Sequence, residues 1–331
     1  VIALLGACVG IIVFFAIFGV SVVIPTNTAW LSDSYRIEGL WDMTQHYLGW
    51  VAYRNTPWHF PIIGLTDGLN SQPISVAYTD SIPLFAIFFK LLSPVLPARF
   101  QYLGIFEILS YALTGALGAL VPYRYRRDAV FCGMSSAFFV LSPVLLKRAL
   151  YHTALSAPFL ILAAMLLWIN ADEISRKKNI VYQTILSVIS LLINPYYVPM
   201  VIGIMLCMLL QKCICGYEIK KLAADIMVPV AALFPVGYFT GLFYGDVSAN
   251  AEGMELVSYN LNQLINPADF PLYHNRDGFT FGRVSYSRFF DGFAVNTEWQ
   301  NEGFSYLGLG VILLAIMALL IYDSPVKSPP P

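Results

Sequence analysis

The chain has 331 residues, of which 58% are hydrophobic and only 12% are charged, whereas soluble domains average about 25% charged residues. Its formal net charge is −1, which excludes the basic surface that nucleic-acid binding requires. Apolar runs of about 20 residues, the length that crosses the hydrocarbon core of a bilayer, recur along the sequence. The composition therefore predicts an all-α polytopic membrane protein that has the lipid bilayer as a partner.

The first apolar run begins at the start of the chain. It is too long for the core of a signal peptide and has no A-x-A cleavage signal, so we interpret 2–24 as a membrane span. Because the chain opens with Val1 and stops at "KSPPP", we expect it to be a piece of a longer protein. The Pro-rich tail 323–331 is then the expected truncation point.

Eight apolar runs are predicted to be spans. They are 2–24, 102–122, 129–149, 154–170, 180–196, 198–211, 224–244 and 304–322. The segment 82–97, "IPLFAIFFKLLSPVLP", is shorter and contains three prolines and Lys90. Its length and its prolines favour a re-entrant or surface-lying helix over a ninth span.

The distribution of charge predicts how these spans are oriented. Basic residues cluster in three short loops, namely Arg124, Arg126 and Arg127, then Arg176, Lys177 and Lys178, then Lys212, Lys220 and Lys221. The positive-inside rule places all three loops in the cytosol, provided that 82–97 does not cross the membrane. Two large loops, 25–81 and 245–303, are then external, and they hold most of the residues that can do chemistry.

The first external loop carries three polar residues at helical spacing. Asp42, Gln45 and His46 stand at i, i+3 and i+4, which puts them on one face if the stretch is helical. One interpretation is a solvated helix with an acid in its first turn. The other is a general base at the boundary of water and lipid, where partial desolvation raises the pKa of a carboxylate.

Asp80 lies just before the short segment, in "YTDSIPL". An acid at this position can cap a helix that starts at Ser81 and has Pro83 in its first turn. The alternative is a polar role for Asp80 in a binding pocket.

Cations and an acid within a predicted span supply further candidates. Lys147, Arg148 and His152 lie in "LLKRALYHTAL", on the face that the positive-inside rule disfavours for cations. The cations either snorkel to lipid headgroups or clamp a phosphate, for which Arg148 offers a bidentate fork. Glu107 lies inside the run 102–122, where an acid indicates a functional site or a hydrogen bond to a neighbouring helix.

The second external loop is rich in aromatic, amide and acid groups. Tyr259, Asn260 and Glu302 are candidate substrate contacts, because such groups can line a pocket for a sugar or a lipid headgroup. They can equally belong to a loop that lies on the membrane surface. The five cysteines form no metal-binding set, and no lipase, zinc-protease or nucleotide-binding motif occurs. We therefore expect no cofactor, and a divalent metal stays a possible ligand that no D-x-D motif supports.

Several segments together resemble a known class of membrane enzyme. They are "DMTQHYLGWVAYRNTPWHFPI", "YTDSIPLFAIFFKLLSPVLP", "FQYLGIF", "LSPVLLKRALYHTAL", "VSYNLNQLINP" and "NEGFSYLGLGVILL". With the order of span, external loop and further spans, they resemble an uncharacterised bacterial family of the C-type (GT-C) membrane glycosyltransferases. That class includes oligosaccharyltransferase and protein O-mannosyltransferase. The resemblance implies that 1–322 is one glycosyltransferase-like domain of eight transmembrane helices, with surface-lying helices in its first external loop.

The resemblance also implies a mechanism. An external acid activates an acceptor hydroxyl or amide, which attacks a sugar carried on polyprenyl phosphate or diphosphate. By position Asp42 matches that acid, and Arg148 and His152 lie where the lipid phosphate would bind. The chain has Asn194-Pro195 where related sequences often have His-Pro, so we assign no role to Asn194. No D-x-D or E-x-D pair occurs in the first loop, so we expect an enzyme that works without a metal.

Two other functions are compatible with the sequence. One is a transporter or flippase for lipid-linked glycans, which would need polar groups along several spans. The other is a non-catalytic partner in the assembly of envelope polysaccharide, for which Asp42 and Arg148 would be replaceable. The leading hypothesis is a glycosyltransferase of the bacterial inner membrane that faces the periplasm and modifies a glycan, lipid or protein acceptor.

Overall fold

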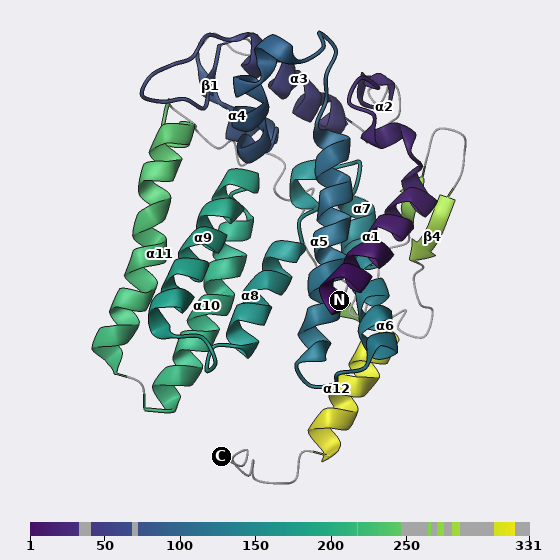
Figure 1. Cartoon of the computed structure of the whole chain (residues 1–331), viewed down its shortest axis with the longest axis vertical. Helices are drawn as coiled ribbons and strands as arrows, with labels where there is room; N and C mark the ends of the chain where they lie inside the picture. The colour runs from purple at the N-terminus through teal and green to yellow at the C-terminus, as the bar shows by residue number, and fades with distance from the viewer. Residues whose placement is uncertain are drawn as a thin grey trace. The chain divides into compact units, whose positions relative to one another are not determined.

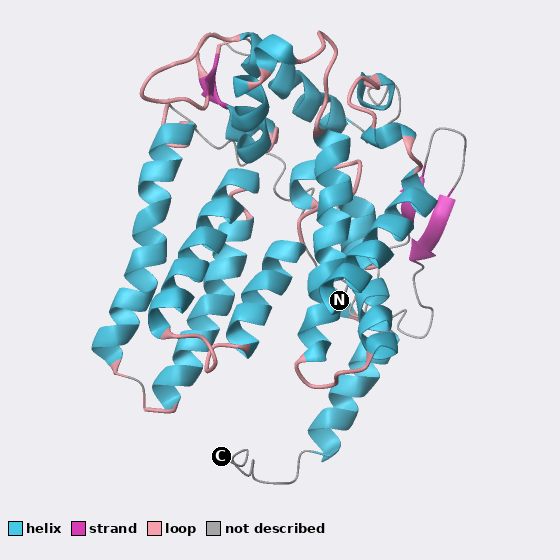
Figure 2. Cartoon of the chain, viewed as in Figure 1, coloured by secondary structure: helices cyan, strands magenta, loops and turns pink. Residues whose placement is uncertain are grey.

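The computed structural model describes residues 1–32, 41–67, 72–216, 218–245, 264–265, 270–274, 280–284 and 308–321. The chain divides into two compact units, Val1–Val247 and Ser248–Pro331. Within the described ranges the first unit is mainly helical, and the second contains one helix and one pair of strands (Figures 1 and 2). The predicted helical class is therefore confirmed.

Helices make up most of the first unit (Figure 1). They are α1 (Ile2–Phe18), α2 (Ala29–Ser32), α3 (Trp41–Asn55), α4 (Pro83–Leu91), α5 (Leu103–Tyr123), α6 (Ala129–Val140), α7 (Pro143–Arg148), α8 (Phe159–Ile169), α9 (Arg176–Ile193), α10 (Tyr197–Ile214) and α11 (Ile219–Thr240). Short 3-10 turns connect them, namely η1 (Ser21–Val23), η3 (Val76–Thr79), η4 (Ser93–Val95) and η5 (Thr153–Leu155).

Strands are few and short. In the first unit β1 (Leu65–Thr66) pairs with β2 (Ile74–Ser75) in antiparallel register. In the second unit β3 (Phe270–His274) pairs with β4 (Thr280–Val284), also antiparallel, and α12 covers Leu309–Ile321. Both hairpins lie in the loops predicted to be external, where an all-α prediction provides for no strand.

Three helices in the described ranges are long and apolar enough to cross a membrane. They are Leu103–Tyr123, Tyr197–Ile214 and Lys220–Thr240, and they agree with three of the eight predicted spans. Four further apolar helices are shorter, at Ile2–Phe18, Ala129–Val140, Thr153–Ile169 and Gly310–Ile321. At 1.5 Å per residue, helices of this length reach less than the roughly 30 Å of a bilayer core when they stand upright.

The prediction of one continuous span over 129–149 is wrong. α6 ends at Val140, and a separate six-residue helix, α7, begins at Pro143. Proline lacks the N–H that a continuing helix needs, and it disfavours helical dihedrals in the residue before it. Ser142 is accordingly extended, with φ −60° and ψ 138°. Because of this break, the segment that carries His152 does not continue the helix α6.

α1 and α5 pack with their backbones in close contact. A Cβ atom on Gly6 would lie 2.2 Å from the carbonyl oxygen of Gly115, and one on Gly10 would lie 2.1 Å from that of Tyr111. Gly6 and Gly10 form a G-x-x-x-G pattern, which brings membrane helices together at short range. This contact holds α1 against α5.

Replacing Gly10 with leucine should disrupt this contact. The new side chain would overlap backbone atoms of α5, and overpacking of this kind costs about 1–3 kcal/mol or more. Gly203→Leu in α10 is the matched control, because nothing lies within 4 Å of a Cβ at that position. We expect a lower folded yield and a lower thermal midpoint in detergent for Gly10→Leu alone. Equal behaviour of the two variants would contradict the packing.

The three predicted basic loops lie together at one end of the first unit. Arg124 in the α5–α6 loop pairs with Glu173 in the α8–α9 loop at 2.5 Å, and Arg176 pairs with Asp225 of α11 at 2.8 Å. Figure 1 shows these loops at the lower end, with α2, α3 and α4 at the upper end. The charged loops therefore share one end, as the predicted topology requires, and α3 lies at the other.

Candidate functional site

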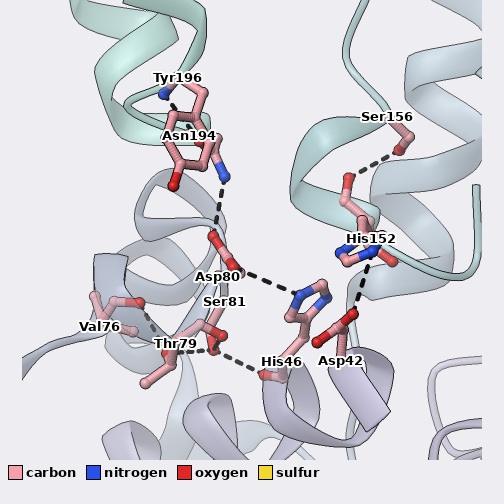
Figure 3. A network of polar contacts seen from close by, with 11 residues as sticks. Asp42, His46, Val76, Thr79, Asp80, Ser81, His152, Ser156, Asn194 and Tyr196 are labelled. Carbon is pink, nitrogen blue, oxygen red and sulfur yellow. Dashed lines mark hydrogen bonds and ion pairs between the residues drawn. The ribbon is translucent and has the colours of Figure 1, made fainter. Parts of the chain in front are cut away.

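Two acids and two histidines meet at the upper end of the first unit, and we call them the acid–histidine cluster (Figure 3). Its members are Asp42, His46, Asp80 and His152. His152 Nε2 lies 3.2 Å from Asp42 Oδ2, and His46 Nε2 lies 3.9 Å from Asp80 Oδ2. The two imidazole ring centroids are 6.5 Å apart. Residues from three distant segments thus form two acid–imidazole pairs that face each other.

α3 supplies the first two members of the cluster. Asp42 lies in its first turn, where the helix dipole favours an acid, and His46 follows one turn later on the same face. The helical spacing predicted for this stretch is confirmed. Gln45 is exposed, and the ion pairs found among the described residues of the cluster do not include it.

Asp80 does not cap α4, so that prediction is wrong. The residue ends η3 with a left-handed φ of 53°. α4 starts only at Pro83, after Ile82 with φ 51° and without a side-chain cap. Left-handed backbone is costly for a β-branched residue such as Ile82, and such strain concentrates at functional sites. The chain turns too sharply here for a regular helix start, and the turn aims the Asp80 carboxylate into the cluster.

Asn194 contacts the cluster, which the sequence did not predict. Its Nδ2 donates to Asp80 Oδ1 at 2.9 Å, and its Oδ1 accepts from the backbone N–H of Tyr196 at 3.0 Å. The second bond fixes the amide so that its donor side faces Asp80. The usable signal was the Asn-Pro break between two apolar runs, which places a buried amide at the end of α9.

The backbone around His46 is held tightly against η3. Ser81 Oγ donates to the carbonyl oxygen of His46 at 2.7 Å and hydrogen-bonds Thr79 Oγ1 at 2.8 Å. A Cβ on Gly49 would lie 2.3 Å from Thr79 Oγ1, so only glycine allows this approach. His46 itself is buried, and among the described residues none hydrogen-bonds its Nδ1. These contacts fix the imidazole in place with its Nε2 towards Asp80.

The surroundings shift the pKa values of Asp80 and His46 in opposite directions. Burial raises the pKa of Asp80 to about 6; the charge of Asp42 raises it further, and the hydrogen bond from Asn194 opposes both effects. Burial, followed by the charge of His152, lowers the pKa of His46 to about 3. His46 is therefore neutral at physiological pH, and Asp80 changes charge close to it. Titratable groups with shifted pKa values beside one another are typical of acid–base sites.

The comparison with protein families gives one match. A family model described as a domain of unknown function, DUF6311, matches residues 7–329. The chain belongs to the DUF6311 family. No curated protein and no solved structure matches it.

Glu107 of the DUF6311 chain hydrogen-bonds the segment that carries His152. It is fully buried in α5; its Oε1 accepts from the backbone N–H of Leu150 at 3.2 Å, and its Oε2 accepts from Ser156 Oγ at 2.8 Å. Leu150 has a left-handed φ of 59°. Glu107 thus anchors both ends of the segment that carries His152, and it lies outside the acid–histidine cluster itself.

The two predicted cations end α7, directly before that segment. Both are half-buried. Lys147 Nζ lies 5.1 Å from the centre of the Tyr151 ring, and the backbone oxygen of Arg148 accepts from the N–H of His152 at 2.8 Å. Arg148 and His152 therefore belong to one short turn, close to Asp42.

The remaining candidates fall elsewhere. Tyr259, Asn260 and Glu302 lie outside the described residues. Within the described ranges, no group of three or more His, Cys, Asp or Glu side chains is arranged to hold a metal ion. The acid–histidine cluster, together with Asn194, offers carboxylate, imidazole and amide groups.

Removal of the Asn194 amide should raise the pKa of Asp80. Asn194→Ala takes away a hydrogen bond to the ionised carboxylate, and such bonds lower a carboxyl pKa. We expect the Asp80 titration, followed by carbon NMR of labelled aspartate and assigned with Asp80→Asn, to move above pH 6. Asn170→Ala at the opposite end serves as the control. An unchanged or lowered midpoint in Asn194→Ala would contradict the assigned role.

Proposed function

We propose that this DUF6311 protein is an integral membrane glycosyltransferase. It moves a sugar from polyprenyl phosphate or diphosphate to a glycan, lipid or protein acceptor at the periplasmic face of the bacterial inner membrane. The observation that carries the proposal is the Asp42–His152 pair at 3.2 Å, beside a second acid whose pKa lies near neutrality. A carboxylate positioned in this way can act as a general base.

Asp42, His152 and Arg148 each have a separate role in the proposed reaction. Asp42 takes the proton from the acceptor hydroxyl or amide as that group bonds to the anomeric carbon. The bond from the anomeric carbon to the phosphate oxygen breaks, and the phosphate leaves with the electron pair. His152 orients the Asp42 carboxylate, and Arg148 in the same turn stabilises the negative charge on the departing phosphate.

Asp80 and His46 form the side of the site opposite Asp42 and His152. The 3.9 Å between Asp80 Oδ2 and His46 Nε2 exceeds a hydrogen bond, so a sugar hydroxyl or a water can bridge the two side chains. Carboxylate and neutral imidazole together can accept and donate hydrogen bonds. This pair is suited to hold the transferred sugar, while Asn194 fixes Asp80.

The arrangement of charge supports the periplasmic placement. The three basic loops lie at one end of the unit, and the acid–histidine cluster lies at the other. Because basic loops remain in the cytosol, the cluster would face the periplasm. There a lipid-borne donor and a water-side acceptor can meet.

Transfer of labelled sugar in proteoliposomes tests this function. Purified protein is supplied with a panel of polyprenyl-phosphate and polyprenyl-diphosphate sugars and with a membrane extract as the source of acceptors. We expect labelled product and free polyprenyl phosphate or diphosphate with at least one donor. Movement of the donor across the bilayer without product would favour the flippase alternative and contradict the enzyme.

A further inference from the structure

The segment 83–98, which contains α4 and η4, has its polar and apolar residues reversed relative to a helix in water. Lys90 is its only charged residue, yet the Lys90 side chain is buried, with 5% of its surface exposed. Large apolar side chains point outward instead, and we call them the apolar face. They are Phe88, Leu91, Leu92 and Val95, of which Leu91 is 63% and Val95 81% exposed.

The ammonium group of Lys90 lies between aromatic rings. Its Nζ lies 4.0 Å from the centre of the Tyr53 ring and 4.6 Å from that of Trp58, and the part of the chain that the structure describes offers it no hydrogen-bond partner. Burial lowers the pKa of Lys90 to about 8, although the charge of Asp67 opposes the change. A lysine beside water normally extends its ammonium into it. Its withdrawal inward indicates that the outer side of α4 is not water.

Arg54 of α3 gives a second, independent indication. Its guanidinium donates to the carbonyl oxygens of four residues around η4, at 2.8–3.3 Å. They are Ser93, Leu96, Pro97 and Ala98. Carbonyl groups in an irregular turn are satisfied by water at a protein surface, whereas in lipid they need a partner from the protein. Arg54 supplies that partner for the whole turn.

We propose that the apolar face inserts into the lipid leaflet next to the acid–histidine cluster, with bilayer acyl chains as its partner. α4 then lies in the membrane surface beside α3, at the end of the unit opposite the basic loops (Figure 1). Asp80 precedes α4 by a short turn, which places the cluster at the level of the lipid headgroups. The inference rests on the membrane placement proposed above and not on the transfer reaction.

Spin labels can measure this insertion directly. Single cysteines replace Leu91 or Val95 in a chain whose five native cysteines are changed to alanine. The labelled proteins are reconstituted in phosphatidylethanolamine and phosphatidylglycerol vesicles that contain no polyprenyl lipid. Leu206→Cys, within the candidate span α10, reports hydrocarbon, and Tyr125→Cys in the α5–α6 loop reports water. Because Val95 is 81% exposed, its replacement should not affect folding.

We expect the labels at 91 and 95 to resemble that at 206, with high accessibility to oxygen and low accessibility to a water-soluble nickel chelate. Nickel accessibility equal to that at 125 would overturn the proposal. Shielding that appears only after polyprenyl phosphate is added would also overturn it, because the face would then bind the donor chain. Neither result depends on whether the protein transfers sugar.

Discussion

Asp42→Asn is expected to reduce sugar transfer by about 10²–10⁴-fold, the usual contribution of a positioned general base. Asparagine has nearly the same shape, and its oxygen can still accept a hydrogen bond from His152. It cannot take up a proton from the acceptor. The loss should therefore appear in the rate of transfer at saturating donor, while donor affinity and folded yield stay close to those of the parent.

The chain offers a matched control for this variant. Asp67 also pairs with a histidine, His59, at 3.0 Å, and it is exposed to a similar degree as Asp42. It lies outside the acid–histidine cluster. Asp67→Asn should keep the parental rate. An equal loss in both variants, or no loss in Asp42→Asn, would contradict the role of Asp42 as the base.

Asp80→Asn should move stability and activity in opposite directions. The raised pKa means that the folded protein holds the ionised carboxylate unfavourably. An asparagine removes that charge and can still accept from Asn194. We expect a gain on the order of 1 kcal/mol at pH 7.5, kept small because 38% of the Asp80 side chain remains in contact with solvent. Transfer should fall by about 10²-fold or more if Asp80 holds the sugar.

The sign of the pH dependence separates this effect from a simple packing change. The folded pKa of about 6 lies above the ordinary value of 3.8 that the carboxyl has in the unfolded chain. Below about pH 3.8 the carboxyl is protonated in both states, so Asp80 costs no stability there. The cost grows as the pH rises through the interval up to about 6 and is complete above it. The advantage of Asp80→Asn should follow the same course.

Thermal unfolding of both proteins in detergent between pH 4 and pH 8 measures this difference. We expect the thermal midpoint of the variant to exceed that of the parent at pH 7.5 and to approach it at pH 4. A constant difference across the range would contradict the titration of Asp80. A variant that is less stable at pH 7.5 would show that the carboxylate stabilises the fold.

Local patterns in the sequence predicted the elements better than the contacts between them. The apolar runs located α5, α10 and α11, because helices of this length follow from composition alone. The helical spacing of Asp42 and His46 also held. These features depend on residues that are neighbours in the chain, so periodicity suffices to find them.

Features that depend on distant residues were not predictable in the same way. The sequence placed Asp80 at a helix start, but its partner Asn194 lies 114 residues away, and the left-handed turn at Asp80 and Ile82 has no sequence signature. Pro143 did carry a signal for the break after α6, which the hydrophobicity of the run 129–149 outweighed. Glu107 was recognised as unusual, yet its role needed the contact with Leu150 to become visible.

Sugar transfer in detergent micelles tests the central claim most directly. Micelles have no two leaflets, so a flippase has nothing to accomplish in them, whereas a transferase needs only its donor and its acceptor. With a donor that is active in proteoliposomes, we predict transfer by the parent protein and its loss in Asp42→Asn. Absence of transfer in micelles, together with equal donor translocation by both proteins in vesicles, would contradict the account.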